Sequence, residues 1–168
     1  MTENFNKNFV TMLGLGKIKK IPGTITSFAT TVILFFYFHV FSLSKTFFLL
    51  FLTVITFYAF VAVANYIKLK QNKDPKEVVI DEFIGQSIPI YLYEISHGTE
   101  KVFMDSAYFY VIIFLVFRFF DIIKPFPVSY FDKNFKNSFG VIMDDIIAGL
   151  YVVLFLIFVM TIKIYFFL

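Results

Sequence analysis

The sequence predicts an all-α, polytopic membrane protein, and the evidence for this is its composition and its long uncharged runs. Of its 168 residues, 59% are apolar and only 16% are charged, and the mean hydropathy is +0.80. Soluble globular domains are about 45–50% apolar and about 25% charged. We therefore expect a single integral membrane domain over residues 1–168, with a cytoplasmic N-terminal segment (1–24) before a helical bundle (25–168).

Four apolar segments are close to the roughly 20 residues that an α-helix needs to cross a bilayer. They are Ile25–Phe41, Thr46–Ile67, Val102–Phe120 and Ile146–Ile162. A fifth segment, Val79–Tyr93, opens with Asp81 and Glu82 near its start and contains Pro89. By length it either crosses the membrane or re-enters on the same side, so we expect four to five membrane segments.

The distribution of basic residues favours a crossing by the fifth segment, because short cytoplasmic loops collect Lys and Arg. If this segment crosses, twelve of the fifteen basic residues lie on one side of the membrane. If it does not cross, the last basic cluster, at and after the end of the segment Val102–Phe120, falls on the opposite side and the bias is lost. We therefore expect five crossings, with the N-terminus in the cytoplasm and the C-terminus outside.

Composition also excludes several classes of function. The chain has no cysteine and only two histidines, His39 and His97, which removes disulfide frameworks, thiolate zinc sites and cysteine nucleophiles. We leave both histidines out of the site. The net charge of +3 comes without a basic stripe interleaved with stacking aromatics, so nucleic-acid binding is not expected. The sequence leaves the oligomeric state open.

Half of the acidic residues lie in or beside apolar segments, where ionisable groups are costly and usually functional. They are Asp81, Glu82, Asp121, Asp132, Asp144 and Asp145. Asp132 apart, the expected topology brings all of them to the cytoplasmic boundary. Converging carboxylates repel one another unless protons or a cation neutralise them, and oxygen ligands favour Mg²⁺ or Mn²⁺. The alternative is that these acids only cap helix starts and pair with nearby cations.

A basic pair accompanies the acids. Arg118, Asp121 and Lys124 recur every three residues, so they share one helix face, and Pro125 with Pro127 then ends the helix. Arg can hold phosphate oxygens in a bidentate fork and Lys adds a point charge. The spacing therefore indicates a phosphate-binding and metal-binding site, or else a cytoplasmic anchor in which Asp121 neutralises Arg118.

Two glycine patterns add to this interpretation. The stretch from Gly14 to Thr24 combines two glycines, Lys17, Lys19 and Lys20, and a Pro-Gly-Thr turn, which could place N–H groups and lysines around a phosphate. Its alternative is a plain interfacial turn. Gly85, Gly140 and Gly149 are small residues that let helix backbones approach closely. They would draw together the helix ends that carry the carboxylates.

Three blocks of the sequence, Val79–Gly85, Phe117–Pro127 and Gly140–Gly149, together with the turn at Pro22-Gly23-Thr24, resemble the phosphatidylglycerophosphatase A family. The blocks occur in the family's order, and the resemblance runs from about Gly14 to the final helix. It implies a Mg²⁺-dependent phosphatase of the bacterial cytoplasmic membrane. Such an enzyme removes the terminal phosphate of phosphatidylglycerophosphate, a phospholipid. The expected topology places the site on the cytoplasmic side of the membrane.

The resemblance also implies a set of site residues. The family's acidic motif positions, catalytic and metal-binding, correspond to Asp81, Glu82, Asp121, Asp144 and Asp145. Arg118, Lys124 and Thr24 are the expected phosphate contacts. The chain departs from the family pattern at Thr26, where a glycine is usual, and at Lys17, Lys19 and Lys20, where small and hydroxyl residues are common.

With no cysteine nucleophile, we expect direct attack on phosphorus by a metal-activated water. One carboxylate would act as general base. Asp145 and Glu82 are the candidates for the base, and Asp81, Asp121 and Asp144 are the expected ligands. An aspartyl-phosphate intermediate is the alternative mechanism.

Three other functions stay open. A non-enzymatic, cation-binding membrane subunit would use the acids to conduct or sense an ion, although no polar chain continues across the helices. A phosphatase acting on another lipid phosphate would use the same residues. A headgroup transferase ranks lower, because the long acid-glycine-arginine signature of the CDP-alcohol phosphotransferases is absent.

Overall fold

The computed structural model describes residues 2–68, 75–96 and 103–167, and in these ranges the chain is helical and contains no β-strand. Three short elements are α1 (Thr2–Val10), the 3₁₀-helix η1 (Met12–Lys17) and α6 (Val128–Asn134). The long elements are α2 (Pro22–Phe35) with its π-helical continuation η2 (Phe36–Val40), α3 (Lys45–Lys68), α4 (Ile80–Ser96), α5 (Phe103–Ile123) and α7 (Ser138–Phe167). The predicted all-α class is confirmed.

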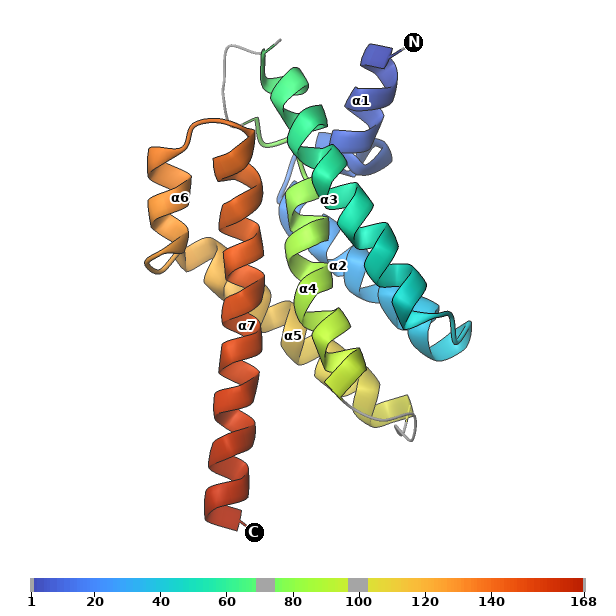
Figure 1. Ribbon diagram of the computed structural model, residues 1–168, viewed down its shortest axis with the longest axis vertical. Coiled ribbons are helices and arrows are strands. Elements are labelled where there is room, and N and C mark those ends of the chain that lie inside the picture. The colour runs from blue at the N-terminus through green and yellow to red at the C-terminus, as the bar shows by residue number, and fades with distance from the viewer. Residues whose placement is uncertain (1, 69–74, 97–102, 168) are drawn as a thin grey trace.

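Four helical stretches are long and apolar enough to cross a membrane. They are Pro22–Val40, Lys45–Lys68, Met104–Ile123 and Ser138–Phe166. Figure 1 shows that successive long helices alternate in direction: α2, α4 and α7 run one way, and α3 and α5 run the other. As a result, the starts of α2 (Pro22), α4 (Ile80) and α7 (Ser138) and the end of α5 (Ile123) lie toward the same end of the bundle. We call it the upper end.

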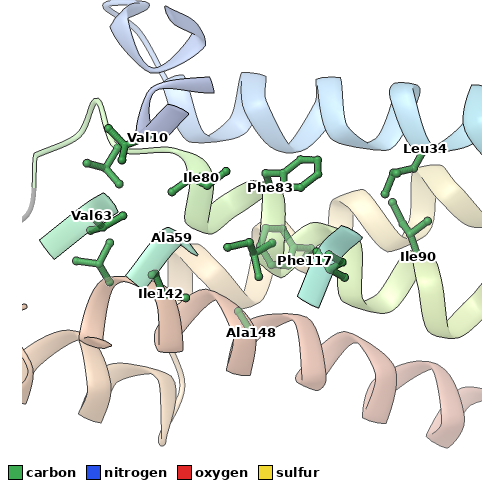
Figure 2. Close-up of a cluster of buried hydrophobic side chains, with 14 of the residues drawn as sticks. Val10, Leu34, Ala59, Val63, Ile80, Phe83, Ile90, Phe117, Ile142 and Ala148 are labelled. Atoms are coloured by element: carbon green, nitrogen blue, oxygen red, sulfur yellow. The ribbon is translucent and has the colours of Figure 1, made fainter. Parts of the chain in front are cut away.

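The short helix α4 is the centre of the bundle. Eleven of its 17 residues are buried, and it contacts α2, α3, α5 and α7. In Figure 2 the apolar side chains of α4 meet those of its neighbours, from Leu34 of α2 to Phe117 of α5 and Ala148 of α7. A helix surrounded by protein does not need a continuous lipid-facing apolar surface, which explains why its sequence signal is weak. At 1.5 Å per residue it is about 25 Å long.

The contact between α4 and α7 is unusually close because both helices carry glycine there. A Cβ atom at Gly85 would lie 2.6 Å from the backbone oxygen of Asp145, and one at Gly149 would collide with the backbone oxygen of Gly85. Pro89 has no N–H to donate the helical hydrogen bond to the carbonyl of Gly85, four residues earlier. This carbonyl oxygen lies against Gly149 of α7. The expected role of these glycines, close helix approach, is what the structure shows.

The last helix begins earlier than the predicted span, at Ser138 instead of Ile146. Asn137 caps it, since its Oδ1 accepts hydrogen bonds from the backbone N–H groups of Phe139 (3.0 Å) and Gly140 (3.1 Å). The sequence places the start of the last membrane segment at Ile146, with Asp144 and Asp145 just before it, and this expectation is therefore wrong. The two aspartates lie about two turns inside the helix, and side chains of the bundle bury them.

The N-terminal segment is also more structured than predicted. Helix α1 packs against α3, and Val10 at its end is fully buried in the core. The backbone N–H of Val79 donates a hydrogen bond of 2.9 Å to the carbonyl of Val10. Residues 2–24 thus form part of the same folded unit as the bundle.

Candidate active site

A cavity of about 430 Å³ opens at the upper end of the bundle, between the starts of α2, α4 and α7 and the end of α5. All the site residues predicted from the sequence line it. They are Thr24, Asp81, Glu82, Arg118, Asp121, Lys124, Asp144 and Asp145. Segments separated by up to 121 positions in the chain therefore meet around one space.

Three of the carboxylates form a tight group. Asp81, Glu82 and Asp145 each contribute an oxygen that lies within 4.8 Å of the other two. Asp81 and Asp145 are only 8% and 4% exposed. Oδ1 of Asp81 and Oε2 of Glu82 are buried and have no hydrogen-bond partner among the described residues. Unpaired buried carboxylate oxygens are costly, and a hard divalent cation such as Mg²⁺ would satisfy them, so the donor set fits that ion.

The group forms because of the glycine contact described above. Asp81 and Glu82 lie in the first turn of α4, one turn before Gly85. The backbone of Asp145 touches Gly85 directly. The absence of a side chain at position 85 therefore lets the Asp145 carboxylate lie next to those of α4.

The start of α2 closes the cavity on another side. Ile21 adopts a left-handed conformation (φ 47°) before Pro22, which occupies the first turn. A Cβ at Gly23 would collide with Oε1 of Glu82, so this glycine lets the helix end approach the carboxylate. Thr24 lines the cavity, as expected.

The glycine-rich part of the predicted phosphate loop lies elsewhere. Gly14 and Gly16 are not among the cavity residues, and Gly16 packs against the backbone carbonyl of Glu77. Of the three lysines in this stretch, only Lys19 lines the cavity. The structure therefore places the Pro-Gly-Thr turn at the cavity and the two glycines before it outside the cavity. The phosphate-binding role of the turn stays a prediction.

Arg118 approaches the carboxylates from α5. One of its Nη atoms lies 2.7 Å from Oδ2 of Asp121, one turn later in the same helix, and donates a 3.3 Å hydrogen bond to Oγ of Ser27. Its Nε is buried without a partner among the described residues. The guanidinium therefore retains a donor that a phosphate oxygen could use.

Lys124 lies directly after the end of α5 and links this helix to α6 and α7. Its Nζ lies 2.7 Å from a carboxylate oxygen of Asp132 in α6 and 2.7 Å from one of Asp144 in α7. Burial lowers the pKa of Lys124, but the two carboxylates raise it by more, so its pKa is above the ordinary value. Lys124 is thus a permanent positive charge in the cavity.

Several cavity residues were not among the predicted site residues. Asp132 was noted as an acid near the membrane, but it lies on α6, a helix too short to predict. Lys19, Lys76 and Lys136 also line the cavity. In the sequence Lys76 and Lys136 only indicated topology, whereas Lys19 was part of the candidate phosphate loop. Gln86, one turn after Glu82, is not among the cavity residues. It is fully buried, and its amide has no partner among the described residues.

A second polar cluster lies at the opposite end of α4. Glu94 is 3% exposed, and its Oε1 lies 3.0 Å from Nε2 of His39 and accepts a 3.2 Å hydrogen bond from the hydroxyl of Tyr110. Lys45 donates to the Glu94 carbonyl. These contacts join the lower end of α4 to η2, α3 and α5. His39 is therefore outside the acidic site, as expected, and His97 lies outside the described residues.

The fold and the cavity together define a polytopic helical membrane protein with a carboxylate-rich polar site at one end of its bundle. Within this class the sequence has a clear affiliation, since the family model described as Phosphatidylglycerophosphatase A matches residues 8–160. The chain belongs to that family.

Curated relatives show the same similarity over shorter stretches. A Bacteroides thetaiotaomicron protein, provisionally named a phosphatidylinositol-3-phosphatase, is 39% identical over 60% of this chain and 58% of its own. The phosphatidylglycerophosphatase A proteins of Haemophilus influenzae and Escherichia coli are 37% and 34% identical. Those two matches cover 48% and 45% of this chain and 44% and 39% of the relatives. No solved structure matches.

Proposed function

We propose that this protein is a Mg²⁺-dependent lipid phosphatase that converts phosphatidylglycerophosphate to phosphatidylglycerol. The observation that carries the proposal is the three-carboxylate group of Asp81, Glu82 and Asp145 in one cavity with Arg118 and Lys124. Negative groups for a cation next to positive groups for a phosphate are what metal-assisted phosphate hydrolysis requires. Family membership supports the substrate.

Asp81, Glu82 and Asp145 would hold the metal. In phosphoryl-transfer sites Mg²⁺ is commonly bound through one or two carboxylates together with substrate phosphates, so this group can provide both ligands and a free carboxylate. When bound, the ion lowers the pKa of water and stabilises charge on phosphoryl oxygens. The free carboxylate, Glu82 or Asp145, would accept the proton of the attacking water.

Arg118 and Lys124 would bind and orient the terminal phosphate. Each already contacts a carboxylate at 2.7 Å, which holds both cations at the cavity wall before substrate binds. In this assignment Asp121 and Asp144 act mainly by positioning the two cations. It modifies the division of roles expected from the sequence, in which both were direct metal ligands.

The position of the cavity supports a lipid headgroup as its substrate. The cavity is at the end of helices whose outer surfaces are apolar and exposed, among them Phe119 and Ile122 of α5, which are 56% and 69% exposed. Basic residues also gather at this end, as expected for a cytoplasmic face. We infer that the site faces the cytoplasm in a bacterial inner membrane.

A second substrate deserves a direct comparison, because one relative's provisional name specifies phosphatidylinositol 3-phosphate. That lipid and phosphatidylglycerophosphate both present a terminal phosphate monoester beyond a phosphodiester. The same carboxylates and cations would act on either headgroup.

The test is phosphate release by detergent-purified protein, with Mg²⁺ and with a chelator, from phosphatidylglycerophosphate and from phosphatidylinositol 3-phosphate. We expect Mg²⁺-dependent release, faster from the first lipid. An Asp81→Asn variant that elutes as folded protein should lose at least about 100-fold in kcat/KM, since the metal contributes several kcal/mol to such reactions.

Two outcomes would contradict the proposal. Release that persists in the chelator would exclude the metal, and no release from folded protein, in detergent and in vesicles, would exclude the phosphatase. The second outcome would favour the alternative of a cation-binding subunit. Measurements of cation flux into vesicles that contain the protein would then test that alternative.

A further inference from the structure

Three lysines from separate loops lie around the mouth of the cavity. Lys19 precedes α2, Lys76 precedes α4 and Lys136 precedes α7, and all three line the cavity and are exposed. We call them the basic rim. Three unconnected loops therefore each contribute one flexible positive charge to the same opening.

The basic rim differs in electrostatic state from the cations deeper in the cavity. Arg118 and Lys124 each contact a carboxylate at 2.7 Å. Lys19 and Lys76 form no ion pair with any described residue, and Lys136 donates only to the backbone carbonyl of Asp132, at 2.7 Å. Three positive charges that pair with no carboxylate of the described residues and face one opening favour binding of an anion there.

The cavity thus has two phosphate-compatible regions. The inner one combines the three-carboxylate group, which would hold a cation, with the paired Arg118 and Lys124. The outer one is the basic rim, where flexible lysines supply point charges without a fixed geometry. A substrate with one phosphate would use only one of these regions.

We propose that the basic rim binds a second phosphate of the substrate, the phosphodiester that joins the headgroup to the diacylglycerol. This inference rests on the proposed function, in which the terminal monoester occupies the inner region. The phosphodiester lies between that monoester and the acyl chains, so it would be held at the mouth of the cavity. The rim would then select lipids with both phosphates over phosphatidate, which has a monoester only.

The chain contains matched controls for this proposal. Lys20 is adjacent to Lys19, and Lys133 lies three residues before Lys136. Both are exposed, and neither is among the residues that line the cavity. Replacing them removes the same charge from the same surface, which separates recognition in the cavity from general attraction to an anionic membrane.

The first experiment compares Lys19→Gln, Lys76→Gln and the double variant with Lys20→Gln and Lys133→Gln, in uncharged detergent micelles. We expect each rim substitution to raise KM for phosphatidylglycerophosphate about fivefold with little change in kcat, as for an exposed charged contact. KM for phosphatidate should stay unchanged in every variant. The two control variants should behave as wild type with both lipids.

The second experiment does not depend on turnover. Deacylated phosphatidylglycerophosphate, which carries both phosphates, and glycerol 3-phosphate, which carries the monoester only, are added with Mg²⁺, and the thermal stabilisation of the protein is measured. Wild type should be stabilised more by the first compound. The Lys19→Gln/Lys76→Gln variant should respond equally to both.

The outcomes separate this inference from the proposed function. Hydrolysis with equal losses in rim and control variants, or equal stabilisation of wild type by the two soluble compounds, would overturn the role of the rim and leave the phosphatase intact. A rim effect seen only in vesicles of anionic lipid would also overturn it, because the bound phosphate would then belong to neighbouring lipids. Selective stabilisation without hydrolysis would support the rim and reject the phosphatase.

Discussion

Asp144 and Asp145 are neighbours in the chain, yet the structure gives them different surroundings. The carboxylate of Asp144 contacts Lys124 at 2.7 Å, whereas that of Asp145 belongs to the group with Asp81 and Glu82. Adjacent residues on a helix point about 100° apart. One aspartate can therefore belong to the three-carboxylate group while the other holds Lys124.

This difference predicts separable effects of two similar substitutions. Asp145→Asn should raise the Mg²⁺ concentration needed for half-maximal activity at least about tenfold, because a ligand carboxylate is lost. Asp144→Asn should lower kcat/KM but change the Mg²⁺ requirement little, because it releases Lys124. Mg²⁺ titrations of phosphate release measure both. Equal shifts in the Mg²⁺ requirement would show that Asp144 is also a ligand.

At the scale of elements, the site depends on how closely α4 and α7 pack. Gly85 and Gly149 remove the side chains that would keep the two backbones apart, and Pro89 turns a carbonyl of α4 toward α7. Asp145 lies on α7 within the same contact. The position of one site carboxylate relative to the other two is therefore set by backbone packing more than by side-chain conformation.

Gly149→Ala tests this dependence. The added methyl group would collide with the backbone oxygen of Gly85, and overpacking of this kind costs about 1–3 kcal/mol. We expect a lower melting temperature in detergent and at least about a tenfold loss of kcat/KM, although residue 149 does not line the cavity.

The matched control is Leu150→Ala, on the same turn of α7 but 44% exposed. It should leave both quantities close to wild type. If Gly149→Ala and Leu150→Ala gave the same kcat/KM, the close contact would not be what positions Asp145.

On the scale of the whole molecule, alternating helix directions collect the polar site at one end and leave Lys45 and Lys163 toward the other. The absence of cysteine makes single-cysteine labelling a direct test of orientation. Lys133→Cys places a thiol at the site end and Ser42→Cys places one at the far end, and both positions are exposed.

In intact bacteria, an impermeant maleimide should label Ser42→Cys and should label Lys133→Cys only after the inner membrane is opened. Lysates labelled in parallel control for reactivity. The reverse pattern would place the site outside the cell and contradict the proposed cytoplasmic orientation.

Much of the fold was predictable because lipid imposes a simple length and composition rule on helices. The four long spans were found for this reason. The fifth segment is a helix, Ile80–Ser96, but it is not one of the four stretches long and apolar enough to cross a membrane, so its predicted crossing stays a prediction. The start of α7 was predicted too late, because its first two turns carry Asp144 and Asp145 and so fail an apolar criterion. Helices α1 and α6 were not predicted, since short helices depend on tertiary contacts.

The sequence by itself determined that the chain lies in a membrane, that its acids and cations gather at one end, and eight of the residues that line the cavity. It could do so because membrane segments must be apolar, which makes every charged residue in or beside them conspicuous. Only the tertiary structure decided which carboxylates form a group, which hold Arg118 and Lys124, and which lysines face the cavity. Those relations depend on the distance between helix backbones, and that distance is set by contacts such as Gly85 with Gly149.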